Sequence, residues 1–105
     1  MEWKDLIVEV EKIEGFCPVY EVGDTFHLSQ GYRLVCSKSC DVCVHALGSL
    51  MTFMVGLSGG LPMEALGLGS ADDEIAHVQC LDPGPPYTHG GTVTFGIRKV
   101  THKAD

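Results

Sequence analysis

Positive charge is scarce in this chain. Seven lysines and arginines stand against fourteen aspartates and glutamates, which gives a formal net charge of −7. The basic residues are scattered, and only Arg98 and Lys99 are adjacent. Such a surface repels phosphate backbones and anionic lipid headgroups. The composition therefore argues against nucleic acid and against a membrane surface as partners.

The first residues are not expected to form a secretory signal, and the sequence contains no internal repeat or low-complexity tract. Residues 1–5 are polar and acidic, without a basic region or an apolar core segment. We therefore expect a cytoplasmic protein whose thiols stay reduced. The length of 105 residues predicts a single domain over 1–105 with its own core, and residues 102–105 as a frayed tail.

A long stretch, Val42 to Met63, contains no aspartate, glutamate, lysine or arginine. It is long enough to span a bilayer. It also contains four glycines and a proline, and it lacks an aromatic belt or flanking clusters of basic residues. These features favour a buried helix in a small domain over a membrane span.

Apolar residues at every second position predict four main strands around this helix. The strands are expected at residues 4–13, 20–28, 75–81 and 92–100, with a short extra strand at 32–35. The residues expected to face the core are Leu6, Val8, Val10, Tyr20, Val22, Phe26, Leu28, Val93, Phe95 and Ile97.

The helix is expected over residues 42–57. Asp41 is suited to its cap or first turn, and Gly59-Gly60 followed by Pro62 is a typical stop signal. The element order is then β-β-α-β-β. This order predicts an α+β fold, with one central apolar helix packed on a small, mostly antiparallel sheet.

Cysteine is abundant for a reduced protein of this size, with five in the chain. Cys36, Cys40 and Cys43 are bunched together, whereas Cys17 and Cys80 lie beside the ends of predicted strands. An odd number of cysteines argues against a complete set of internal disulfides. Thiolates are soft ligands, so a convergent group predicts a metal or redox site.

Four short motifs resemble those of a family of small uncharacterised bacterial and archaeal proteins of about this length. They are Lys12-Ile-Glu-Gly-Phe-Cys17-Pro18, Val22-Gly23-Asp24, Cys40-x-x-x-x-His45-Ala46-Leu47 and Cys80-x-Asp82-Pro83. The resemblance covers most of the chain and implies that Cys17, Cys40, His45 and Cys80 are the family positions. Asp41 and Leu81 depart from it, since the family often has proline there. The resemblance implies no activity.

The leading hypothesis is a metal-binding module. Cys17, Cys40, Cys80 and His45 would form a tetrahedral Cys3His set, which is typical of zinc. With Cys36 or Cys43 recruited, four thiolates would instead suit an iron–sulfur cluster.

Two further hypotheses stay open. The first is a thiol-based redox protein or nucleophilic enzyme at Cys40 and Cys43, with His45 as the base. The second is a small structural or interaction domain without a metal, in which a homodimer covers the apolar helix. The sequence does not decide whether the protein is an enzyme.

Overall fold

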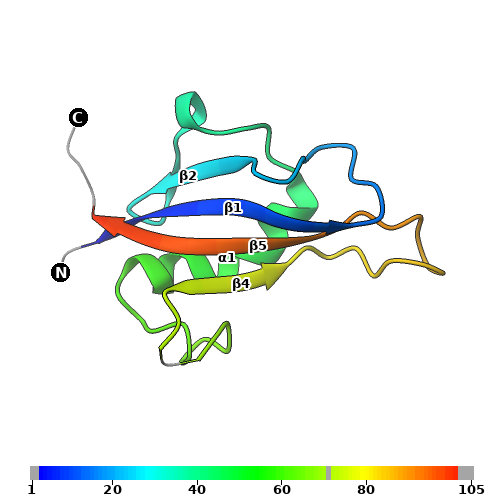
Figure 1. Cartoon of the computed structure of the whole chain (residues 1–105). Helices are drawn as coiled ribbons and strands as arrows, with labels where there is room; N and C mark the ends of the chain where they lie inside the picture. The colour runs from blue at the N-terminus through cyan, green and yellow to red at the C-terminus, as the bar shows by residue number, and fades with distance from the viewer. Residues whose placement is uncertain (1–2, 71, 102–105) are drawn as a thin grey trace.

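The computed structural model describes residues 3–70 and 72–101, so the predicted tail at 102–105 lies outside the described residues. The fold is α+β, as predicted: within the described residues, one α-helix lies against one face of a five-stranded antiparallel sheet (Figure 1). The sheet order is β3-β2-β1-β5-β4, which places the two longest strands side by side in the centre. The elements in chain order are β1 (Lys4–Glu14), β2 (Thr25–Ser29), β3 (Arg33–Leu34), the 3-10 turn η1 (Cys36–Lys38), α1 (Val44–Ser58), β4 (Ile75–Gln79) and β5 (Thr92–Thr101).

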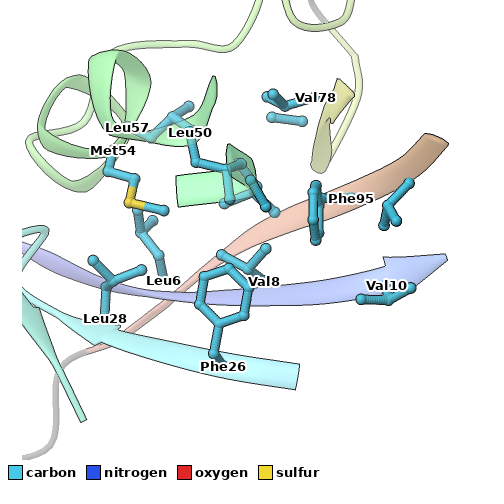
Figure 2. Packing of buried hydrophobic residues seen from close by; sticks show 14 of the residues in the cluster. Leu6, Val8, Val10, Phe26, Leu28, Leu50, Met54, Leu57, Val78 and Phe95 are labelled. Atoms are coloured by element: carbon cyan, nitrogen blue, oxygen red, sulfur yellow. The ribbon is translucent and has the colours of Figure 1, made fainter. Parts of the chain in front are cut away.

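The core lies between α1 and the sheet. The alternation predicted for the first and last strands is confirmed, because Leu6, Val8 and Val10 of β1 and Val93, Phe95 and Ile97 of β5 are buried there. Figure 2 shows Leu50, Met54 and Leu57 of α1 directed at side chains of the sheet. Full burial of one large apolar side chain contributes about 1.5–3 kcal/mol. This two-layer packing therefore holds the helix in place on the sheet.

The second predicted strand is wrong over its first half. β2 begins only at Thr25, and residues 21–24 form a turn in which the Asp24 carboxylate accepts the Glu21 N–H at 2.8 Å. Gly23 has a φ of 97°, which suits a turn rather than a strand. Val22 is consequently 64% exposed instead of facing the core, whereas Tyr20 is buried as expected.

The predicted start of the helix is also wrong. α1 begins at Val44 with Cys43 as its N-cap, and its first turn contains no acidic residue, so Asp41 lies outside it. The preceding chain is held along β2 instead. Ser39 Oγ accepts the His27 N–H at 3.0 Å, and the Cys40 N–H donates to the Thr25 carbonyl at 2.9 Å. These bonds hold Ser39 and Cys40 beside β2, and Cys43 has an extended backbone with φ −76° and ψ 131°.

The predicted end of the helix is confirmed to within one residue. α1 stops at Ser58, directly before Gly59-Gly60, and the buried Ser58 hydroxyl donates to the Lys4 carbonyl at the start of β1. Among the helices of the described residues, none combines the length and the apolar character that crossing a bilayer requires.

Two loops meet at the end of the sheet where β1 and β4 finish (Figure 1). The Gly91 N–H, in the loop before β5, donates to the Glu14 carbonyl at 2.8 Å. Gly91 has a φ of 95°, and a Cβ atom there would lie 2.4 Å from the Phe16 carbonyl oxygen. Glycine is therefore required for the two loops to approach this closely. Their approach brings residues 15–17 beside residues 90–91.

Candidate functional site: a thiol-lined pocket

Three of the five cysteines and His45 line one pocket at this end of the sheet. The pocket has a volume of about 340 Å³. Its walls come from four chain segments, and the residues are Phe16, Cys17, Pro18, Val19, Tyr20, Cys43, His45, Ala46, Cys80, Asp82, Gly90, Gly91 and Val93. All five cysteines are free thiols, and the three in the pocket are half-buried. The pocket therefore gathers sulfur atoms from distant parts of the sequence.

Cys17 and Cys43 are linked through Tyr20. The Tyr20 N–H donates to Cys17 Sγ at 3.4 Å, and the Tyr20 hydroxyl accepts the Cys43 N–H at 2.8 Å. The Tyr20 ring is fixed by the core, with its centroid 5.5 Å from that of Phe95 in an edge-to-face contact. Tyr20 thus positions the loop after β1 against the start of α1.

The Tyr20 hydroxyl stays protonated across the physiological pH range. Burial raises the pKa of Tyr20 to about 12, and the nearby thiols of Cys40, Cys43 and Cys17 add to this rise when they are ionised. The hydrogen bond from the Cys43 backbone acts in the opposite direction and is outweighed. Tyr20 therefore serves this site as a neutral group that positions other residues.

Cys80 follows β4 directly and is held by the first residues of β5. Its sulfur accepts the Val93 N–H at 3.2 Å and lies 3.6 Å from the Gly91 carbonyl oxygen, to which a thiol can donate. A backbone N–H donated to sulfur fixes the position of the sulfur atom. Two of the three sulfurs in the pocket, those of Cys17 and Cys80, have such a donor.

Cys43 is the N-cap of α1 and therefore stands at the positive end of the helix dipole. No side chain accepts a hydrogen bond as a cap there, and the first turn carries no acidic residue. The first N–H groups of a helix have no partner within the helix and favour a nearby negative charge. The start of α1 therefore presents a favourable field to anionic sulfur.

His45 and Asp82 add a nitrogen and a carboxylate to the wall. His45 is exposed in the first turn of α1, and Asp82 is half-buried in the loop after Cys80. Hydrogen bonds from the Thr88 hydroxyl and the Gly84 N–H lower the pKa of Asp82, with a smaller contribution from His45. The carboxylate is ionised at neutral pH and makes the pocket more attractive to a cation.

The two remaining cysteines do not line the pocket. Cys40 is half-buried before α1, and burial, followed by the charge of Asp24, raises the pKa of its thiol. Cys36 is exposed on η1, with its sulfur 3.9 Å from the Leu34 carbonyl oxygen. Of the residues predicted from sequence, Cys17, Cys43, His45 and Cys80 are brought to one pocket, and Cys36 and Cys40 are outside it.

Sequence reasoning missed Tyr20 and Asp82 as parts of the site. The sequence predicts Tyr20 only as a residue that faces the core, and it offers Asp82 only as part of the motif Cys80-x-Asp82-Pro83. The available signal was spacing, since Tyr20 follows Cys17 by three residues and Asp82 follows Cys80 by two. A backbone N–H three residues after a cysteine is well placed to reach its sulfur, as it does here.

The potential metal ligands that line the pocket do not surround a common point. Within residues 3–70 and 72–101, no three histidine, cysteine, aspartate or glutamate side chains form a group close enough to hold a metal ion. A metal ion held by the residues that line the pocket would require their side chains to rotate toward a common point.

Comparison of the chain with protein-family models, with curated proteins and with solved structures gives no match. The family resemblance described above therefore stays a prediction.

Proposed function

We propose that this protein binds a soft metal ion, with zinc preferred, through the thiolates of Cys17, Cys43 and Cys80 and the imidazole of His45. The observation that carries the proposal is the convergence of these four donors, from three separate chain segments, on one pocket. Three thiolates and one imidazole are a typical tetrahedral zinc set. The proposal keeps the predicted Cys3His composition but takes Cys43 in place of Cys40.

The hydrogen bonds around the sulfurs support this choice. The N–H groups of Tyr20 and Val93 donate to Cys17 Sγ and Cys80 Sγ and so orient both sulfurs at the pocket. Cys40 lies outside the pocket, and burial and the charge of Asp24 raise the pKa of its thiol, which disfavours the deprotonated form that a metal ion requires. The ionised Asp82 beside the pocket adds attraction for a cation.

Metal titration of the reduced protein tests the proposal. We expect Co²⁺ to give the visible bands of a tetrahedral thiolate complex at a ratio of one ion per chain, and Zn²⁺ to displace it. The absorption of protein purified without oxygen distinguishes the other predicted cofactor, because an iron–sulfur cluster is coloured without added cobalt. A folded protein that neither retains nor takes up metal would overturn the proposal.

A second candidate function, a nucleophilic thiol enzyme, is favoured by one specific observation: Cys43, His45 and Asp82 line the same pocket. A cysteine at a helix N-terminus beside a histidine and a carboxylate is an arrangement suited to nucleophilic catalysis. Cys40, the other predicted nucleophile, is unsuited because its thiol has a raised pKa. The candidate nucleophile is therefore Cys43.

Alkylation of the metal-free protein with iodoacetamide, followed by peptide mass spectrometry across pH, separates the two candidates. We expect the exposed Cys36 to react fastest and the half-buried Cys40 slowest, with the Cys40 profile displaced to higher pH by its raised pKa. Faster reaction of Cys43 than of Cys36 near neutral pH would identify an activated thiolate and favour the enzyme. Slower reaction of Cys43 would remove that candidate.

A further inference from the structure

The outward face of α1 is uncharged and largely apolar. Its exposed residues are Val44, His45, Gly48, Met51, Thr52 and Val55, and none is an aspartate, glutamate, lysine or arginine. Val44 is 78% exposed, Met51 60% and Val55 54%. Scattered single apolar residues on a surface are ordinary, but a continuous row along one helix is characteristic of an interface.

An apolar groove runs beside this row of side chains. It lies between α1 and the β2–β3 turn and is lined by Leu28, Gly31, Tyr32, Leu34, Leu47, Met51, Met54 and Val55. Met51 and Val55 belong both to the exposed row and to the groove. A projecting row and a hollow next to it on the same face suit self-complementary packing, which a twofold dimer requires.

The distribution of charge favours a second copy of this chain as the partner. The chain carries a net charge of −7, and exposed acids such as Glu9 lie on the sheet face opposite α1. Two copies that met through acidic surfaces would repel each other. The 15 residues of α1 contain no acid and no lysine or arginine, so two copies meeting there bring no like charges into direct contact.

We propose that two copies of the chain associate through α1, with the two helices packed antiparallel about a twofold axis near Met51. The small residues Gly48 and Thr52 lie between the larger Val44, Met51 and Val55 along the exposed face. Large side chains of one helix then fit beside small ones of the other. Of the exposed residues on this face, His45 also lines the pocket, whereas Val44, Gly48, Met51, Thr52 and Val55 do not.

Sedimentation equilibrium of the wild-type protein and of the variants Met51→Glu and Met51→Lys tests the dimer. We expect twice the chain mass for the wild type at micromolar concentration and the chain mass for each variant alone. An equimolar mixture of the two variants should restore the doubled mass, because opposite charges then face each other across the axis. Val22→Glu, at an exposed apolar residue in the β1–β2 turn, is the matched control and should stay dimeric.

A wild-type monomer at millimolar concentration would overturn the proposal and leave a partner of different sequence as the occupant of this face. A wild-type dimer that persists unchanged in both Met51 variants would overturn it as well, because the contact would then lie elsewhere. Circular dichroism of each variant establishes that the fold is retained, as expected for a side chain that is 60% exposed.

Discussion

Replacement of Cys80 by serine is expected to weaken zinc binding by at least about 100-fold, since changes in groups that merely support a ligand already cost about 10- to 100-fold. Cys80 Sγ is held in the pocket by the Val93 N–H at 3.2 Å. A serine hydroxyl accepts the same hydrogen bond, so the fold should be retained. It remains protonated at neutral pH, however, and is a poor ligand for a soft ion.

Competition with a chromophoric chelator measures this effect, and Cys36→Ser is the matched control. Cys36 is exposed on η1 and lies outside the pocket, so its replacement should leave the zinc affinity unchanged. Equal affinity of Cys80→Ser and the wild type would show that the ion, if bound, is held elsewhere.

The same assay distinguishes the ligand set taken from the pocket from the set implied by the family resemblance. Cys43→Ser should weaken binding as strongly as Cys80→Ser, and Cys40→Ser should have little effect. A larger loss of zinc affinity in Cys40→Ser than in Cys43→Ser would indicate that Cys40 is a ligand. The chain before α1 would then have to rearrange to bring Cys40 into the pocket.

Truncation of Phe95 to alanine is expected to destabilise the protein by about 3–5 kcal/mol, the usual cost of removing a buried aromatic ring. Phe95 is fully buried on β5, which lies between β1 and β4 in the sheet. Its ring contacts Tyr20 at 5.5 Å and Phe26 at 6.2 Å, both edge-to-face. The cavity would loosen Tyr20, which bridges Cys17 and Cys43, so metal affinity should fall together with stability.

Urea unfolding followed by circular dichroism measures the change in the free energy of unfolding. Phe16→Ala is the control, because Phe16 is 76% exposed and its truncation should change stability by no more than about 0.5 kcal/mol. If Phe95→Ala does not fold, the smaller truncation Phe95→Leu should fold with a loss of stability below that expected for alanine. A change below about 1 kcal/mol for Phe95→Ala would mean that the aromatic contacts do not hold the core.

Regular elements were predictable where a periodic pattern met no competing local interaction. β1 and β5 follow the predicted alternation closely, because each strand buries one continuous row of apolar side chains under α1. The prediction was wrong at Val22, where the Asp24 carboxylate and Gly23 close a turn. It was wrong again at Asp41, where hydrogen bonds from β2 delay the helix. Both errors come from hydrogen bonds that involve side chains or distant residues. An alternating pattern of apolar residues does not reveal such bonds.

The candidate site, like the fold, was predictable only in part. The types of donor were predictable, since free thiols and a histidine near predicted strand and helix ends are visible in the sequence. Which cysteines line the pocket was not predictable, because Cys40 and Cys43 are only three residues apart and either was compatible with the pattern. The first turn of α1 decided between them by placing Cys43 at the helix cap and leaving Cys40 beside β2.

By itself, the sequence determined the fold class, the two central strands and the uncharged character of the helix, because each depends on interactions between neighbours along the chain. Only the tertiary structure decided which sulfurs share a pocket. That outcome depends on contacts between remote residues: the Gly91 backbone against Glu14 and Phe16, and Tyr20 between Cys17 and Cys43. The physical reason is that these contacts depend on the pairing of β5 with β1, which brings the two loops together.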